Sequence, residues 1–326
     1  MRICIYGAGA SGGHLALRLA RAGHEVGVLA RGTQLAALGA QGVTMLSGEA
    51  VLTAKVRASD DPAALGPQEL VLVTVKATGL AAVAAGLAPL VDGATQVLFL
   101  QNGMAWWYPQ GLPPDRPAPP DLPIFALGAR FLDVLWPAQV LGGSLYSANV
   151  LEAPGVVRNT SPGRNGIALA PIVATAEPEA AAMRAVLAGA GLDCPPVDDV
   201  RCMVWSKLLV NMSGSAIALA TENRSSVCRT DPALADIYSR AVREGLEIAR
   251  AHGYPLDAIV DPERLLDGLH DHKPSLLQDY EAGRRMELAE IIAAPMAFAR
   301  AAGLATPTLD TLAAIVLRRA RDRGLL

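Results

Sequence analysis

The sequence predicts an α/β N-terminal domain with a doubly wound parallel sheet, followed by an all-helical C-terminal domain. Three observations support this prediction. Apolar strand patterns alternate with helical patterns early in the chain, a glycine-rich turn follows the first strand, and strand patterns cease beyond Asp199. The length of 326 residues also favours two domains, which we place at residues 1–199 and 200–326.

The elements of the N-terminal domain follow from short apolar runs that are separated by glycine and polar residues. They are strands at Arg2–Tyr6, Glu25–Leu29, Leu70–Val75 and Gln96–Leu100, helices up to Ala22 and near Pro178–Ala190, and a short strand around Leu192. A proline-rich stretch, Tyr108–Pro123, is predicted to form an extended surface loop that flanks a site or an interface.

The C-terminal domain is predicted from helical periodicity and helix-start signals. Asp231 and Pro232 have the residue types of an N-cap and a first helical position. The predicted helices are Trp205–Ala220, Asp231–His252, Pro262–His270 and Met286–Ala302.

Composition and charge exclude several classes of protein. Hydrophobic residues make up 52% of the chain and charged residues 18%, as in a compact globular protein rather than a disordered one. A net charge of −3 without a basic cluster gives no footprint for nucleic-acid binding. The four cysteines have no CxxC spacing, so we expect reduced thiols and no metal site.

Two apolar stretches are candidates for a signal peptide and for a membrane-spanning helix, and neither has the required pattern. Ser11, His14 and Arg18 interrupt the apolar start of the chain. The uncharged stretch Ala94–Pro114 contains prolines and polar amides, which do not suit a spanning helix. We therefore expect a soluble cytoplasmic protein with no membrane partner.

The clearest motif is the glycine-rich turn in the segment RICIYGAGASGG. Gly7, Gly9 and Gly12 have GxGxxG spacing directly after a strand and before a helix, as in a Rossmann-type dinucleotide-binding domain. The glycines permit a tight turn, close approach of the pyrophosphate and close helix–strand packing. We group Ser11 with them in the cofactor-binding set, while an ordinary glycine-rich turn remains the alternative.

The residue type at the end of the second strand predicts which dinucleotide binds. An NAD enzyme usually has a carboxylate there, but this chain has Ala30 and Arg31. An arginine can pair with a 2′-phosphate, so NADP(H) is favoured. The alternative is that Arg31 is an exposed residue at the helix start.

Two further polar residues follow predicted strands. Lys76 comes after LVLVTV, and Asn102 comes after VLFL and is followed by Gly103. Open α/β sheets bind ligands at the carboxyl ends of their strands, so we expect both side chains to face the nicotinamide. Each could also be an ordinary turn residue.

One apolar helix carries a row of polar residues. Lys207, Asn211 and Ser215 fall at i, i+4 and i+8 of WSKLLVNMSGSAIALA, which places them along one face. Two hydrogen-bonding residues beside a lysine favour a polar pocket, although a lysine can also extend to solvent. Further along, Ser275 and Glu287 lie at predicted helix starts, where they could cap a helix or bind a ligand, and Glu287 could pair with Lys207.

Together these segments resemble the ketopantoate reductase family, and the resemblance covers nearly the whole chain. It rests on the order and spacing of GAGASGG, Val75-Lys76, Asn102-Gly103, WSKLLVN at 205–211, SLLQD at 275–279 and GRRMEL at 283–288.

The resemblance implies a role for each residue that matches the family pattern. Lys207 would be the general acid, with Glu287 beside the reacting centre. Asn102 and Lys76 would lie by the nicotinamide and the substrate. Asn211 and Ser275 would bind a keto acid, and we group Ser215 on the same helix face with them as substrate-binding.

The chain also departs from the family pattern. Ser215 stands where a second asparagine is common, and Met286 stands where a threonine often precedes the glutamate. Both changes would alter the substrate pocket. Trp106, Trp107 and Tyr108 add bulk beside Asn102, which suits a larger or more apolar substrate.

The predicted function is NADPH-dependent reduction of a 2-oxo acid to the 2-hydroxy acid, with ketopantoate and pantothenate biosynthesis as the leading assignment. The alternatives are a related reductase of another ketone or imine, and a non-catalytic NADP-binding sensor. The expected partner is a small keto acid. A homodimer through the helical domain and a monomer are both open.

Overall fold

The computed structural model describes residues 1–326, which divide into two compact units. The first unit comprises residues 1–101 and 127–200, and the second comprises residues 102–126 and 201–326. The last junction therefore lies next to the predicted boundary at residue 199. Residues 102–126 differ from the prediction, because they belong with the helical unit although both of their neighbouring segments belong to the first unit.

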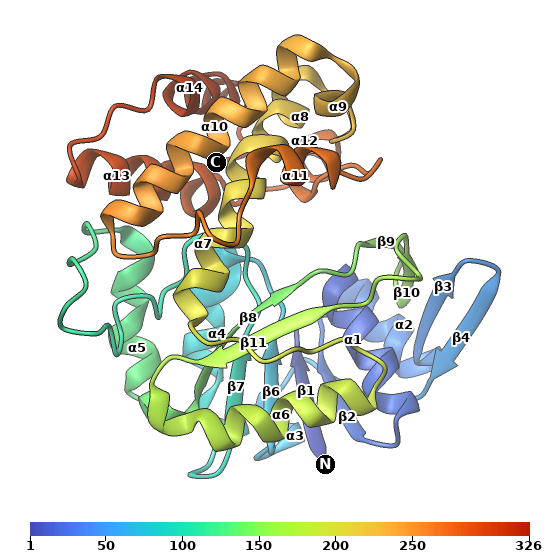
Figure 1. Cartoon of the computed structure of the whole chain (residues 1–326). Coiled ribbons are helices and arrows are strands. Elements are labelled where there is room, and N and C mark those ends of the chain that lie inside the picture. The colour runs from blue at the N-terminus through green and yellow to red at the C-terminus, as the bar shows by residue number, and fades with distance from the viewer. The chain divides into compact units, whose positions relative to one another are not determined.

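The first unit is built on a seven-stranded sheet with the order β11-β8-β7-β6-β1-β2-β5. Neighbouring strands are parallel except for β11 and β8, which are antiparallel. The predicted doubly wound sheet is confirmed (Figure 1). Its strands are β1 (Arg2–Tyr6), β2 (Glu25–Leu29), β5 (Arg57–Ser59), β6 (Leu70–Val73), β7 (Gln96–Phe99), β8 (Val140–Leu145) and β11 (Ile167–Pro171).

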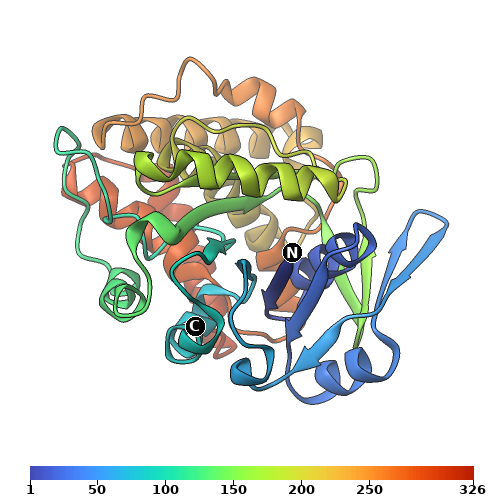
Figure 2. The same cartoon turned by 90° about the horizontal axis from the view of Figure 1, so that it is seen from below.

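Helices of the first unit bury the faces of this sheet. Helix α6 packs against β11, as Figure 2 shows. Side chains such as Ile3, Leu15 and Leu72 are fully buried in the shared core. The helices are α1 (Ala10–Arg21), α2 (Gly32–Gln41), α3 (Pro62–Leu65), α4 (Leu80–Gly86), α5 (Leu127–Leu132) and α6 (Glu177–Gly189), with 3-10 turns η1 (Ala77–Gly79), η2 (Ala88–Leu90), η4 (Pro137–Gln139) and η5 (Ala174–Ala176).

A second sheet was not predicted from the sequence. Its order is β4-β3-β10-β9, and its strands are β3 (Val43–Ser47), β4 (Ala50–Ala54), β9 (Asn149–Ala153) and β10 (Val156–Asn159). Helix α1 packs against strands of both sheets. A Cβ atom at Gly13 would lie 2.5 Å from Val157 Cγ2, so this glycine lets the second sheet approach α1. The pair Gly48-Glu49 between two apolar runs was the available hairpin signal.

The strand order creates a topological switch point beside β1. From β1 the chain passes to β2 and β5 on one side of the sheet, and it returns to β6 on the other side. Ligands of open α/β sheets bind at such points, beyond the carboxyl ends of the strands. Gly7 follows β1 and Thr74 follows β6, so both lie at this edge of the sheet.

The second unit is helical, as predicted. Its elements are η3 (Pro123–Ala126), α7 (Val200–Val210), η6 (Asn211–Ser215), α8 (Ala216–Thr221), α9 (Val227–Thr230), α10 (Pro232–Ala251), α11 (Pro262–Asp267), α12 (Ser275–Glu281), η7 (Ala289–Ala293), α13 (Ala294–Ala301) and α14 (Pro307–Asp322).

The segments α7, η6 and α8 form one apolar helix over Val200–Thr221. By length and composition this helix could cross a membrane, with a mean hydropathy of 1.3. However, 72% of its most apolar window is buried inside the protein, as in the core helix of a folded unit.

Residues 102–126 join the second unit through aromatic packing and hydrogen bonds. Trp205 Nε1 donates to the Tyr108 hydroxyl at 3.0 Å, and the Tyr108 and Phe298 rings meet edge to face. Arg201 donates to the carbonyl oxygens of Tyr108 and Gln110. These contacts explain why residues 102–126 pack with the second unit and not with the first.

The aromatic run beside Asn102 does not have the role that the sequence suggested. Trp106, Trp107 and Tyr108 are each at most 1% exposed, so their rings lie in the core and do not widen an open pocket. The inference of a larger or more apolar substrate from these three residues is therefore corrected.

Several predicted boundaries shift in the structure. The strand predicted at Leu70–Val75 ends at Val73, the strand at Gln96–Leu100 ends at Phe99, and the strand around Leu192 is only an isolated bridge between Gly166 and Asp193. The helix predicted at Pro262–His270 ends at Asp267, and helical structure predicted from Met286 begins at Leu288. Asp231 caps α10 as predicted, accepting from the amides of Ala233 and Leu234.

Close packing at the glycine-rich turn can be tested through stability. Gly12→Ala is expected to destabilise the protein by about 1–3 kcal/mol, because its Cβ would lie 1.9 Å from the Gly7 carbonyl oxygen. Gly39→Ala is the matched control inside α2, where nothing lies within 4 Å. That variant should gain about 0.4–1 kcal/mol. Urea unfolding measures both changes, and equal stabilities would contradict the packing argument.

Candidate active site

The glycine-rich turn has the backbone geometry that a dinucleotide site requires. Gly7 has φ of +118°, and a Cβ there would lie 2.7 Å from Val75 Cγ1. Gly12 packs on the Gly7 carbonyl oxygen, as described above. By contrast, a Cβ at Gly9 would meet no protein atom within 4 Å. Two glycines therefore serve packing, and the third leaves open space beside the backbone.

The start of α1 is free to receive an anion. This helix has 12 residues, its N-cap Gly9 makes no side-chain cap, and no acidic residue lies in its first turn. Unpaired amides and the helix dipole at such a start favour a phosphate group. Ser11 lies in this first turn and is half-buried. The turn and the helix start together fit a dinucleotide pyrophosphate.

Hydrogen bonds hold the neighbouring loops to this turn. Thr74 Oγ1 donates to the Gly7 carbonyl oxygen at 2.8 Å, and Gln101 Nε2 donates to the carbonyl oxygens of Val73 and Val75 at 2.9 Å each. Sequence reasoning did not assign these roles to Thr74 or Gln101. Lys76 follows directly, half-buried, at the N-cap of the turn Ala77–Gly79.

Arg31 lies just beyond the end of β2, as predicted. It is exposed, and it occupies the N-cap position of α2 without making a side-chain cap. Burial raises the pKa of Tyr6, and the charge of Arg31 opposes that rise, which places the guanidinium near the end of β1. A cation without an accompanying acid at this strand end suits a 2′-phosphate.

In the second unit, Lys207 and Glu287 interact electrostatically. Burial lowers the pKa of Lys207 to about 8, and the Glu287 carboxylate opposes that fall. Glu287 is 4% exposed, and its carbonyl oxygen accepts from the Ile291 amide at 3.0 Å at the start of the following helix. The two residues that the sequence nominated as catalytic therefore act on each other within one unit.

Two π-helical segments follow these residues. One is Asn211–Ser215 and the other is Ala289–Ala293, and they pack against each other. On a regular α-helix, residues at i and i+8 would diverge by about 80°. The wider turn of a π-helix reduces this drift, and π segments are frequent at functional sites. The helix predicted over Trp205–Ala220 is present as part of one continuous helix, Val200–Thr221, and its segment Asn211–Ser215 is π-helical. Asn211 is half-buried and Ser215 is buried.

The Asn102-Gly103 turn lies against the second π segment. Met104 N donates to the Glu290 carbonyl oxygen at 2.9 Å. Gly103 has φ of +81°, and a Cβ there would lie 2.6 Å from the Glu290 carbonyl carbon. The turn is thereby held directly on the backbone that follows Glu287, with Asn102 half-buried. Asn102 belongs to the second unit, whereas Lys76 belongs to the first.

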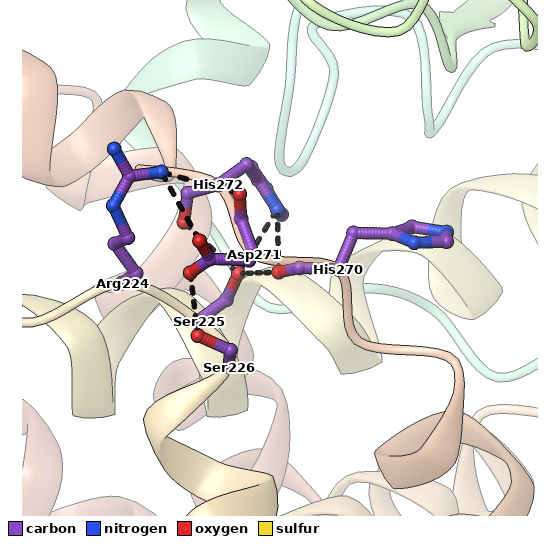
Figure 3. A network of polar contacts seen from close by, with 6 residues as sticks. All are labelled: Arg224, Ser225, Ser226, His270, Asp271 and His272. Atoms are coloured by element: carbon purple, nitrogen blue, oxygen red, sulfur yellow. Dashed lines mark hydrogen bonds and ion pairs between the residues drawn. The ribbon is translucent and has the colours of Figure 1, made fainter.

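A network of polar contacts fixes the loop before Ser275 (Figure 3). Ser225 Oγ donates to the His270 carbonyl oxygen at 2.7 Å and lies 2.9 Å from His272 Nδ1. Ser226 Oγ donates to Asp271 at 2.6 Å, and Arg224 pairs with the same carboxylate at 3.6 Å. The loop is thus tied to the segment after α8, and it leads into Ser275, the exposed first residue of α12.

The two units provide complementary chemistry. The first has an open glycine-rich turn at the switch point of a doubly wound sheet, and the second has a lysine of lowered pKa beside a buried glutamate. This combination is typical of oxidoreductases that pair a bound dinucleotide with a protein proton donor.

Comparison with known proteins identifies the family. Residues 3–106 match the family model described as ketopantoate reductase PanE/ApbA, and residues 199–320 match the model for its C-terminal part. The 2-dehydropantoate 2-reductase of Mesorhizobium japonicum is 32% identical over 99% of this chain and 99% of its own length. The chain belongs to the ketopantoate reductase family and is an oxidoreductase.

Solved structures agree on the fold. The crystal structure of a candidate ketopantoate reductase from Ralstonia solanacearum MolK2 is 33% identical and has a TM-score of 0.88, covering 100% of this chain and 99% of that chain. A D-mandelate dehydrogenase solved with NADH and anilino(oxo)acetate has a TM-score of 0.85 over 100% of both chains. At 19% identity, this second likeness shows the fold alone.

The electrostatic interaction predicts how Lys207 titrates. We expect the Lys207 side chain to have a pKa of about 8. Glu287→Gln should lower this pKa further, because it removes a negative charge that favours the protonated amine. NMR of the lysine side-chain resonances over a pH series measures both values, with Lys207→Arg used to assign the signal. An unchanged pKa in Glu287→Gln would contradict the proposed interaction.

Proposed function

We propose that this protein reduces the C2 carbonyl of a 2-oxo acid with NADPH, with ketopantoate or a close analogue as substrate and pantoate or its analogue as product. The lowered pKa of Lys207 beside Glu287 is the observation that carries the proposal. A group that titrates near neutral pH is well matched to proton transfer under physiological conditions. The family membership and the name of the Mesorhizobium japonicum relative also support it.

The chain's own residues have defined tasks in this reaction. When bound, the reduced nicotinamide supplies the hydride that the C2 carbon of the keto acid accepts. The Lys207 ammonium donates a hydrogen bond to the ketone oxygen, stabilises the negative charge that develops there, and transfers its proton to form the hydroxyl. Solvent then returns a proton to the neutral lysine. Glu287 keeps the amine protonated at neutral pH by raising its pKa.

The substrate would be oriented by neutral hydrogen-bonding groups. The proposed set consists of Asn102 on the Asn102-Gly103 turn, Asn211 and Ser215 on the first π segment, and Ser275 at the start of α12. Amide and hydroxyl groups bind a keto acid carboxylate without adding charge beside Lys207.

We further propose that NADP(H) is preferred over NAD(H). The proposed cradle consists of Gly7, Gly9, Ser11 and Gly12 at the pyrophosphate, Arg31 at the 2′-phosphate, and Lys76 near the nicotinamide. The exposed Arg31 and the absence of an acid at the end of β2 support this preference. A cytoplasmic location and a homodimer through the helical unit both stay predictions.

The role of Lys207 is testable by turnover. Lys207→Ala should lower ketopantoate-dependent NADPH oxidation by about 100- to 10,000-fold, because the proton donor is lost. NADPH binding, measured by fluorescence titration, should stay nearly unchanged. Lys55→Ala, at an exposed position in the first unit, is the control and should keep full activity. Full activity in Lys207→Ala would remove the proposed proton donor.

The cofactor preference is testable at Arg31. Arg31→Ala should weaken NADPH binding by about 10- to 100-fold and leave NADH binding nearly unchanged, because a charge-assisted hydrogen bond to the 2′-phosphate is lost. Arg21→Ala, which removes an exposed charge at the end of α1, is the control. Calorimetric titration with each cofactor gives the comparison, and equal losses for both would argue against the assignment.

A further inference from the structure

Glu290 lies beside the residues that are proposed to bind the keto acid. It follows Glu287 by three residues and belongs to the π segment Ala289–Ala293, which packs against the segment carrying Asn211 and Ser215. The Asn102-Gly103 turn packs directly on the Glu290 backbone. A Cβ at Gly103 would collide with that backbone, and Met104 N donates to the Glu290 carbonyl oxygen. All of these residues belong to the second unit.

The carboxyl group of Glu290 has no partner for one of its oxygens. Oε2 is buried and makes no hydrogen bond. Burial raises the pKa of this carboxyl group. The negative charge that acts on Lys207 is that of Glu287, so Glu290 is a separate acid with no assigned task in proton transfer. Buried polar atoms are normally hydrogen-bonded, and one left over beside a substrate site suits a donor supplied by the ligand.

We infer that Glu290 sets which substituent the 2-oxo acid can carry: it accepts a hydrogen bond from a donor on the side chain of the substrate and rejects a second carboxylate. This inference rests on the proposed function. The groups proposed to bind the substrate's own carboxylate are neutral. Glu290 would repel that carboxylate if the two lay next to each other. Glu290 therefore faces the substituent rather than the carboxylate of the keto acid.

Discrimination of this kind follows from the physics of buried acceptors. A site built to bind a hydroxyl group penalises an analogue that lacks it, because the buried acceptor then stays unsatisfied. Repulsion between two carboxylates in a poorly solvated site adds a separate penalty against dicarboxylates. The two effects respond differently to substitution. Glutamine removes the charge and keeps one acceptor, whereas leucine removes both.

Three substrates and two variants test the inference. Ketopantoate and 3,3-dimethyl-2-oxobutanoate differ by one hydroxyl group, and 2-oxoglutarate carries a second carboxylate. In the wild-type enzyme, kcat/KM should favour ketopantoate over the deoxy analogue by about 10- to 100-fold. Glu290→Leu should bring that ratio close to one, and Glu290→Gln should retain part of it. Both variants should raise kcat/KM for 2-oxoglutarate by about tenfold or more.

Controls separate this inference from the proposed function. Glu247→Leu, at an exposed position of α10, should leave all three ratios unchanged. If Glu290→Leu does not fold, Glu290→Gln still tests the charge through the 2-oxoglutarate ratio. Turnover of ketopantoate with ratios that neither variant alters would overturn the role of Glu290 alone. No binding and no turnover of any of the three acids by wild-type enzyme with NADPH would overturn both.

Discussion

Burial of a single ammonium group is the constraint on which the second unit depends. A lysine on an otherwise apolar core helix loses hydration, which lowers its pKa, and a nearby negative charge opposes that fall. Glu287 provides that charge from the start of another helix. The two helix segments are thus linked by one electrostatic interaction, and moving them apart would lower the pKa of Lys207.

The irregular features of the second unit lie around this pair of residues. A π segment follows Lys207, another follows Glu287, and the two contact each other. Regular α-helices would offer all of their inner carbonyl groups to their own amides, whereas the second π segment has a carbonyl that accepts from the Asn102-Gly103-Met104 turn. Local irregularity therefore joins a turn from a distant part of the sequence to the helix start that carries Glu287.

Local signals in the sequence predicted the parts of the fold that depend on short-range patterns. The glycine spacing after β1, the Asp231 cap and the apolar strands at the switch point are such signals, and the structure bears them out. The second sheet escaped prediction because it joins two local hairpins, β3–β4 and β9–β10, through a pairing of β3 with β10 across about a hundred residues. The burial of Trp106 and Trp107 was also not predicted, because the sequence does not show against which unit this loop packs. The π segments escaped because an extra residue per turn leaves no signature in apolar periodicity.

The route of the chain has a consequence for how this protein can change by recombination. Residues 102–126 leave the first unit, pack Tyr108 against Trp205 and Phe298, and return, so the backbone passes from one unit to the other at residues 101, 126 and 200. A gene fragment that encodes only residues 201–326 would lack the turn bearing Asn102 and would expose the aromatic core that Tyr108 covers. The helical unit is therefore not a portable module, because it is complete only when residues 102–126 accompany residues 201–326.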